Sequence, residues 1–263
     1  MAGTYRLMQG KVKAMDEAGG SGLPAILEAA WGVRPRSGKR RQPALSLESV
    51  VEAAVRVAAS EGLAAVSMNR VATELDASAM SLYRYVAGKD ELLVLMADTA
   101  YRTSPSPREP GDAWRDGLSR WAWDLHRMLR QHTWVLKIPI SGPPATPRMV
   151  AWVEHGLSCL ADTGLAETEK LSVMMLLNGF VRSEATVFAD FSESYTQAGA
   201  TSQEAMSFYS SLLGKLADPE RFPAFHAALS AGGYDVEGGE HDEFVFGLDR
   251  ILDGIEKLIE SRS

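Results

Sequence analysis

The sequence predicts an all-α protein in which a set of short helices is followed by a larger helical domain. From residue 46 onward, apolar residues recur three and four positions apart, which is the spacing of one face of a helix. Proline, glycine and small polar residues interrupt this pattern, and no alternating strand pattern of useful length is found. With 46% hydrophobic residues, the 263-residue chain can fill a core in each part.

Three segments are expected along the chain: a flexible N-terminal extension with a basic arm over residues 1–45, a compact helical domain over 46–96, and a second helical domain over 97–263. Residues 1–22 show no sustained period and are expected to be largely disordered. Residues 23–31 predict one or two helical turns that dock on a later helix. Two prolines and a glycine in the basic arm exclude a regular helix there.

Charge is distributed unevenly along the chain. The protein carries a formal net charge of −7, but residues 34–89 contain nine Lys and Arg against five Asp and Glu. Residues 111–263 contain 13 basic and 22 acidic residues. A polyanion would therefore be attracted by the N-terminal part and repelled by the rest. The basic arm, which is either a DNA contact or a solvated linker, contains Arg34, Arg36, Lys39, Arg40 and Arg41.

Serine residues mark the expected helix starts in the 46–96 domain. Ser46 caps a first helix that Gly62 ends, and Ser67 caps a second. The second helix stops at Asp76, because an acidic side chain tolerates the left-handed backbone of a tight turn. Ser78 then caps a third helix. Two short helices joined by such a turn predict a helix-turn-helix, whose second helix fits the major groove of DNA.

The third helix, expected over 78–85, is predicted to present its outer face to DNA. Leu82 and Val86 lie four residues apart on its inner face. The other positions carry hydroxyl groups, a thioether and a guanidinium, which suit phosphates, thymine methyl groups and base edges. These outward residues are Ala79, Met80, Ser81, Tyr83, Arg84 and Tyr85.

The stretch from Leu45 to Leu93 contains four short motifs: Gly-Leu at 62–63, Val-Ala-x-x-Leu at 71–75, Leu-Tyr-x-Tyr-Val at 82–86 and Lys-Asp-Glu-Leu-Leu at 89–93. In residue types and spacing, this stretch resembles the N-terminal domain of the TetR family of repressors. One departure from the family pattern is Asp76, which stands where a glycine is usual and places a negative charge near DNA. Another departure is the long N-terminal extension.

This resemblance implies a set of DNA contacts. It places Asn69 and residues 79–81 at base edges, and Arg84 at either a base or a phosphate. The implied phosphate contacts are Ser67, Ser78, Tyr83, Tyr85 and Lys89, so the full set is Ser67, Asn69, Ser78, Ala79, Met80, Ser81, Tyr83, Arg84, Tyr85 and Lys89.

Beyond residue 110, the sequence resembles the regulatory half of the tetracycline repressor and its nearer relatives. The resemblance implies a ligand pocket inside the helices, a homodimer, and loss of operator affinity when ligand binds. It also implies that two helices of each subunit build most of the dimer interface. We assign this role to 167–190, the most apolar helix, and to 241–261, whose wide apolar stripe needs a partner. Apart from these two, helices are expected from Trp114 to beyond Met128, from Pro147 to Gly164, over Ser202–Ala217 and over Pro219–Ser230.

Aromatic, soft apolar and occasional polar residues in this half offer the mixture that small-molecule pockets use. For any single tryptophan or methionine, core packing is the better explanation, since a helical domain needs large residues to fill it. His126 and Asn178 require a hydrogen-bond partner, which is a ligand, another side chain or water. The candidate pocket residues are Trp121, His126, Trp134, Trp152, Met175 and Asn178.

No catalytic residue, metal site or cofactor is predicted. The five histidines form no His-x-x-x-His pair, and Cys159 is expected to be a buried structural thiol. The glycine-containing basic segment lacks the spacing of a phosphate-binding loop. The alternative to a regulator is a helical enzyme or adaptor that uses its helix-turn-helix for protein contact, and the hydroxyl-rich outer face of 78–85 argues against it.

The sequence therefore predicts a cytoplasmic, one-component transcriptional regulator without a membrane span or secretory signal. Its expected partners are a double-stranded DNA operator, a small-molecule inducer of unknown identity and a second copy of the chain. A dimer would place two reader helices in successive major grooves about 34 Å apart on a roughly palindromic operator. Ligand binding would favour a conformation that no longer matches this spacing. Repression is the expected output, with activation as the alternative.

Overall fold

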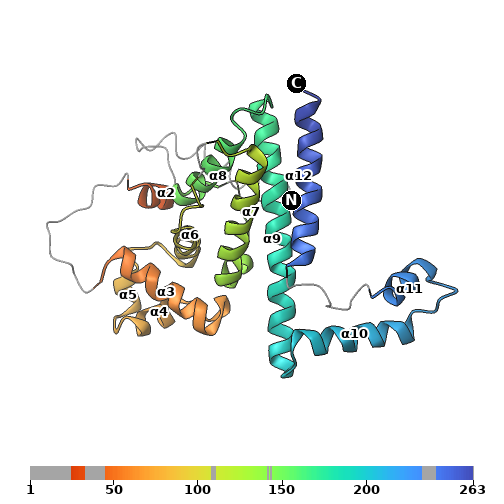
Figure 1. Ribbon diagram of the computed structural model, residues 1–263. Helices are drawn as coiled ribbons and strands as arrows, with labels where there is room; N and C mark the ends of the chain where they lie inside the picture. Colours follow the sequence, from red (N-terminus) through yellow and green to blue (C-terminus); the bar gives the residue numbers. More distant parts are fainter. Residues whose placement is uncertain are drawn as a thin grey trace. The chain divides into compact units, whose positions relative to one another are not determined.

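The computed structural model describes residues 25–32, 45–107, 111–140, 142, 144–232 and 241–262. Throughout these ranges the regular structure is helical and no strand occurs, so the predicted all-α class is confirmed (Figure 1). The expectations for residues 1–22 and for the basic arm lie outside the described residues. No helix in the described ranges combines the length and apolar character needed to cross a membrane.

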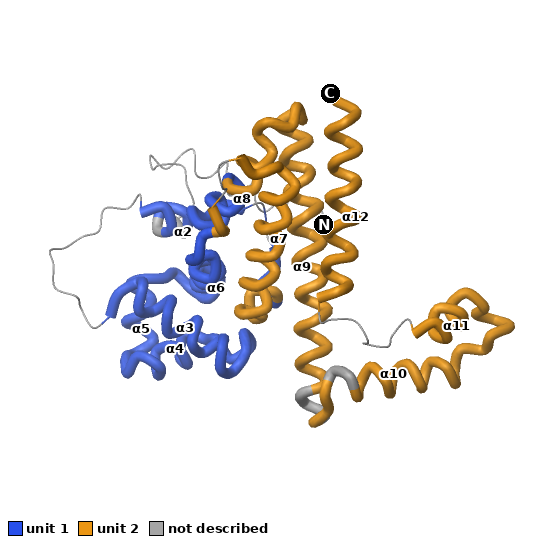
Figure 2. Tube along the Cα trace, viewed as in Figure 1, with its two compact units in different colours: residues 1–104, 137–154 blue, residues 105–136, 155–263 orange. Residues whose placement is uncertain are grey.

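The chain divides into two compact units (Figure 2). Unit 1 comprises residues 1–104 and 137–154, and unit 2 comprises residues 105–136 and 155–263. Helix α8, Pro147–Cys159, is shared: its first eight residues are grouped with unit 1 and its last five with unit 2.

The helix ends of unit 1 lie where the serines and glycine predict them. Helix α3, Leu47–Glu61, begins with a capping box in which the Ser46 side chain accepts from the Ser49 backbone N–H and the Ser49 hydroxyl accepts from the Ser46 N–H. Gly62 ends α3 with a positive φ of 83°, a conformation that favours glycine. A 3₁₀ turn, η1 (Leu63–Ala65), leads to α4, Met68–Glu74, which Ser67 caps.

Helix α5 is shorter than predicted. Ser78 caps it as expected, but the α-helix covers only Ala79–Leu82. The next residues close tighter turns, because the Tyr85 N–H donates to the Leu82 carbonyl three residues earlier. Helix α6, Lys89–Ala100, follows. The apolar interior of these helices is built from small aliphatic side chains and a few larger ones, including Val50, Ala54, Val57, Val71, Leu82, Val86, Leu92 and Met96.

A short N-terminal helix packs on α6. This helix, α2, covers Ala25–Ala30, in agreement with the helical turns predicted over 23–31. The indole Nε1 of Trp31 donates to the Ala145 carbonyl at 2.8 Å, which ties the end of α2 to the segment preceding α8. The expected docking of this segment on a later helix is therefore confirmed.

Unit 2 is built around three long helices that pack on one another: α7, Trp114–Gln131, α9, Glu167–Ala198, and α12, Asp242–Glu260. Glycine allows a close approach between two of them. A Cβ on Gly247 would lie 2.5 Å from the Phe180 ring, so only glycine fits at that point of α12. Cys159 is a buried free thiol, as predicted.

The remaining elements of unit 2 are a 3₁₀ helix, η2 (Thr133–Lys137), and a pair of smaller helices, α10 (Ser202–Leu216) and α11 (Pro223–Ser230), which pack on each other. Three predicted boundaries were wrong. Helix α8 ends at Cys159 rather than near Gly164, because the intervening residues form i to i+3 turns. Helix α9 continues to Ala198 rather than 190, and α11 begins at Pro223 rather than Pro219.

Candidate DNA-binding surface and regulatory core

The turn between α4 and α5 has the geometry of a helix-turn-helix. Asp76 adopts a φ of +50°, and it is the one non-glycine residue with positive φ among those the structure describes. The Ala77 N–H donates back to the Ala72 carbonyl at 2.9 Å and so closes the end of α4. Asp76 thus performs the conformational role that a glycine usually fills, as the sequence predicted.

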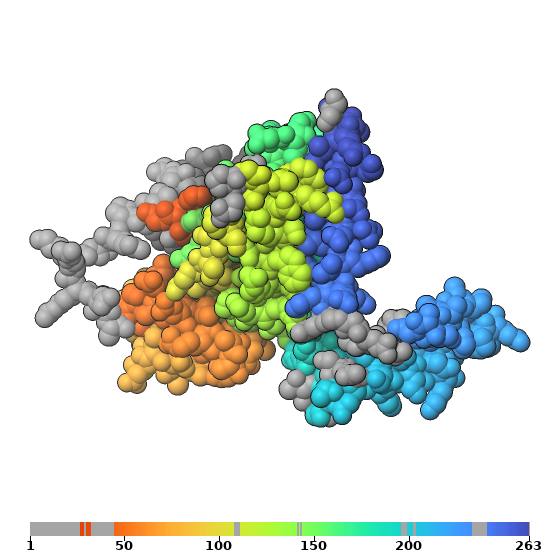
Figure 3. Space-filling model, in the orientation of Figure 1, coloured from red at the N-terminus to blue at the C-terminus, as the bar shows by residue number. Residues whose placement is uncertain are grey.

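The outer face of α5 is accessible to solvent. Met80 is 78% exposed and Tyr83 51% exposed, whereas Leu82 between them is fully buried. The hydroxyls of Ser78 and Ser81 lie 2.7 Å apart and share a hydrogen bond. All ten residues predicted to contact DNA lie at the surface of unit 1, seven of them exposed and Ala79, Ser81 and Tyr85 half-buried; in Figure 3 this surface lies in the orange range of the colour bar.

Tyr85 has a partner inside the protein. Its hydroxyl donates its single proton to the Leu45 carbonyl at 2.9 Å. Ser67 differs, because its oxygen accepts from the Arg70 N–H and its own proton is left for a phosphate. The hydroxyl of Tyr85 therefore fastens the end of the α5 segment to the residue that precedes Ser46.

The basic side chains of α3 and α4 are paired within unit 1. Arg70 donates to Glu61 at 3.0 Å and to Glu74 at 3.1 Å, and Arg56 donates to Glu74 at 3.3 Å. These bonds raise the pKa of Arg70, chiefly through Glu61, and lower the pKa of Glu74, chiefly through Arg56. Residues 45–89 contain four Lys and Arg against five Asp and Glu, so this stretch carries no excess of positive charge.

The interior of unit 2 contains buried polar groups among aromatic rings. His126 is 2% exposed, stacks on Phe244 with ring centroids 4.3 Å apart, and lies edge-on to Trp123. Its Nε2 lies 2.6 Å from a carboxylate oxygen of Glu184. Although these atoms are close, neither makes a hydrogen bond of acceptable geometry, and the buried Nε1 of Trp134 also has none. Buried polar atoms without such partners are candidates for ligand contacts.

The structure separates the predicted pocket residues. Trp121, His126 and Trp134 are buried in unit 2, and Asn178 is half-buried on α9. Trp152 belongs to unit 1, where its Nε1 donates to backbone carbonyls of Tyr101 and Thr103.

Among the predicted pocket residues, Met175 is the one that the structure leaves exposed to solvent. It is 76% exposed, whereas the preceding Met174 is buried, because successive residues of a helix point about 100° apart. The sequence analysis missed Glu184. It falls three residues after Val181 and seven after Leu177, on the buried stripe of α9, and this spacing could have identified it.

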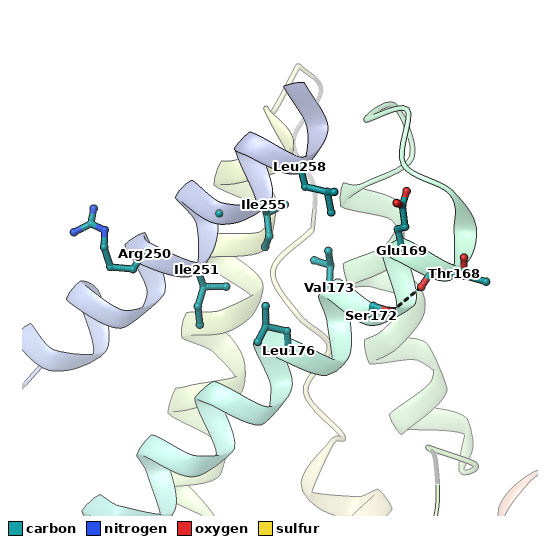
Figure 4. Close-up of a pocket in the computed structure, with 10 residues that line it drawn as sticks. Thr168, Glu169, Ser172, Val173, Leu176, Arg250, Ile251, Ile255 and Leu258 are labelled. Atoms are coloured by element: carbon teal, nitrogen blue, oxygen red, sulfur yellow. Dashed lines mark hydrogen bonds between the residues drawn. The ribbon is translucent and has the colours of Figure 1, made fainter. Parts of the chain in front are cut away.

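An apolar groove of about 550 Å³ lies between α9 and α12 (Figure 4). Its walls are aliphatic side chains from both helices, with a few polar residues. The residues that line it are Thr168, Glu169, Ser172, Val173, Leu176, Arg250, Ile251, Gly254, Ile255 and Leu258.

A turn-linked helix pair with an exposed second helix, followed by a large helical unit, defines a helix-turn-helix transcriptional regulator. Residues 50–96 match the family model described as bacterial regulatory proteins, tetR family, and residues 106–259 match the tetracyclin repressor-like C-terminal domain. The chain belongs to the TetR family. The predictions of family, fold and a transcriptional regulator rather than an enzyme are thereby confirmed.

Individual relatives agree with this assignment. The chain is 36% identical to the HTH-type transcriptional repressor DrrR1 of Streptomyces coeruleorubidus over 96% of this chain and 93% of that protein. The structure resembles apo ActR of Streptomyces coelicolor, with a TM-score of 0.71 at 24% identity over 85% of this chain and 100% of that chain. ActR in complex with actinorhodin gives a TM-score of 0.66 at 27% identity, covering 82% and 98% of the two chains.

Proposed function

We propose that this TetR-family regulator is a dimeric repressor that binds a palindromic operator and releases it when a small molecule enters unit 2. The observation that carries the proposal is the exposed, hydroxyl-rich face of α5 behind the left-handed turn at Asp76. The side chains of this face do not contribute to the apolar core of unit 1. Their hydroxyls and thioether can contact the phosphates, base edges and thymine methyl groups of DNA.

We assign the DNA contacts of α5 and of the neighbouring residues on α4 and α6 to two groups. Asn69 and residues 79–81 read base edges, and Arg84 contacts a base or a phosphate. Ser67, Ser78, Tyr83 and Lys89 bind phosphates. Instead of the phosphate contact implied by the family resemblance, we assign Tyr85 the role of holding the α5 segment against Leu45, since its proton is already donated there.

Residues 45–89, which we call the reader, lack the excess positive charge that attracts DNA. The basic arm supplies this charge. Because residues 45–89 have no excess of positive charge, the five arm residues from Arg34 to Arg41 are the main source of it near the reader. A chain starting at Pro43 should bind DNA with a salt slope reduced by about 0.9 for each phosphate that the arm neutralises in the full-length protein. An unchanged slope would identify the arm as a linker.

A second copy of the chain fits the α9–α12 groove. Exposed apolar side chains flank it, among them Leu171, Met175 and Leu176 on α9. A two-fold dimer would cover both stripes, because the same surface is used by each copy. Leu176→Asp should yield a monomer in sedimentation velocity, whereas Lys257→Gln, on the exposed side of α12, should remain dimeric. A dimeric Leu176→Asp chain would place the interface elsewhere.

The ligand is proposed to bind in unit 2 next to the buried polar atoms of His126 and Trp134. A hydrogen-bonding ligand would give the Trp134 Nε1 a partner and would compete with Glu184 for the His126 Nε2. Actinorhodin, the ligand bound to ActR, is a suitable first probe, and quenching of tryptophan fluorescence reports binding. Quenching that His126→Leu abolishes would support this site, and quenching that the variant leaves unchanged would exclude it.

The DNA role is tested by a mobility shift with the DNA immediately upstream of the gene that encodes the chain. Saturable binding by the wild type that Tyr83→Ala and Arg84→Ala both weaken would support the proposal. Tyr85→Ala is a poor control, because it also removes the bond to Leu45. Weak, sequence-independent binding shared by all variants would favour the adaptor alternative.

A further inference from the structure

The first turn of α8 is capped by a side chain from α6. Pro147 has no N–H, so Arg148 contributes the first backbone donor of α8. This N–H donates to Asp98 Oδ1 at 3.0 Å, and the Arg148 guanidinium donates to Asp98 Oδ2 at 3.2 Å. Thr146, the residue in the usual capping position, leaves its buried hydroxyl oxygen without a hydrogen bond. The cap of α8 thus comes from a residue 50 positions earlier in the chain.

Hydrogen bonds from Trp152 also join α8 to the end of α6. Trp152 lies one turn after Arg148 on the same face of α8, and its Nε1 donates to the carbonyls of Tyr101 and Thr103 at the end of α6. The Tyr101 ring meets the Trp152 ring edge-on at 5.7 Å. Both Asp98 and Trp152 are buried, so these contacts are shielded from water. We call this set, Asp98, Arg148, Trp152 and Tyr101, the α6–α8 clasp.

The same face of α8 continues into tight packing in unit 2. Gly156 follows Trp152 by four residues, and a Cβ at Gly156 would lie 2.1 Å from Met174 Cε. Cys159, three residues further on, contacts Gly117 so closely that a Cβ there would lie 2.8 Å from its Sγ. One continuous helix therefore carries the clasp at its start and close contacts with α7 and α9 at its end.

We propose that Asp98 is a positioning residue for DNA binding: by capping α8 it fixes the orientation of α6, and hence the spacing of the two reader helices in the dimer. Helix α6 begins directly after the reader segment and packs on α3. Its N-terminal end is thus attached to the reader and its C-terminal end to α8. This inference rests on the proposed dimeric DNA-binding function.

The test measures the distance between the two readers directly. A nitroxide on Met80→Cys, which is exposed, reports the reader-to-reader distance in the full-length dimer by double electron–electron resonance, and buried Cys159 is shielded from the label. Asp98→Ala removes both oxygens that accept from Arg148, and we expect a broader distance distribution. With Met80 restored, the same change should weaken binding to the upstream DNA about five- to thirty-fold. Glu220→Gln, which changes an exposed carboxylate between α10 and α11, should change neither quantity.

A second variant keeps the test decisive if Asp98→Ala fails to fold. Trp152→Phe retains an aromatic ring but loses the Nε1 donor, and it should broaden the distribution in the same way. A distribution identical to the wild type in the folded variants would overturn the inference. If the spin-labelled Met80→Cys chain, which is otherwise wild type, shows no dipolar modulation, the proposed dimer is refuted, and the inference with it.

Discussion

The interior of the DNA-reading helices consists mainly of small aliphatic side chains, whereas the interior of unit 2 contains tryptophans, a histidine and a carboxylate. In α3 to α5, each helix begins with a serine cap and its buried residues need only apolar neighbours. In unit 2, His126 on α7 and Glu184 on α9 are 58 positions apart in the chain, and their facing atoms lie 2.6 Å apart. These atoms make no hydrogen bond of good geometry. The reader is suited to keeping one conformation, and the polar core of unit 2 leaves groups that a ligand can engage.

The largest effect is expected from opening a cavity in the reader. Leu82 is fully buried, so Leu82→Ala should lower the free energy of unfolding by about 2–5 kcal/mol. Chemical denaturation measures this change, and Met80→Ala is the matched control, since Met80 is exposed on the same helix. Equal effects of the two substitutions would contradict the description of the reader as an apolar core beneath an exposed face.

The buried pair in unit 2 is expected to behave differently from the reader core. His126→Leu leaves the Glu184 carboxylate without its neighbour, which should cost about 1–3 kcal/mol. Adding Glu184→Leu should restore part of this stability, because two apolar side chains avoid the desolvation of a lone polar group. A double-mutant cycle in denaturant measures the coupling. Strictly additive effects would show that the two groups do not interact.

Removal of a helix cap should have a smaller effect. Ser46 accepts from the Ser49 N–H at 3.0 Å, and Ser46→Ala should destabilise the protein by about 1 kcal/mol. Thermal unfolding of this variant, compared with Ser194→Ala on the exposed face of α9, measures the cap separately from the removal of a hydroxyl. Indistinguishable unfolding temperatures would contradict the capping role.

The smallest effect concerns the ion pairs between α3 and α4. The pKa of Glu74 is lowered in the folded state, so its contribution to stability is present above its ordinary value of 4.5 and is lost as the pH falls through the lower folded value. Glu74→Gln should therefore flatten the pH dependence of the free energy of unfolding below pH 4.5. Because the side chain is only half-buried, added salt should diminish the same difference. A pH profile identical to the wild type would exclude this contribution.

The comparison also explains what could be predicted from the sequence. Caps and the turn at Asp76 depend on neighbouring residues, and these positions were predicted correctly in the reader. The cap of α8 by Asp98 and the approach of Glu184 to His126 depend on residues at least 50 positions apart, which no local pattern reveals. The exposure of Met175 could not be predicted, because the apolar run around it does not indicate the phase of α9. Its face is the one assigned to the dimer.

The central claim is that two copies of α5 read one operator, and hydroxyl-radical footprinting on the upstream DNA tests it most directly. We predict two protected patches related by two-fold symmetry, with their centres about one helical turn, or 34 Å, apart. Removal of the proposed dimer interface by Leu176→Asp should abolish the paired pattern. Uniform protection without symmetry, or a paired pattern that the Leu176→Asp chain retains, would contradict the account.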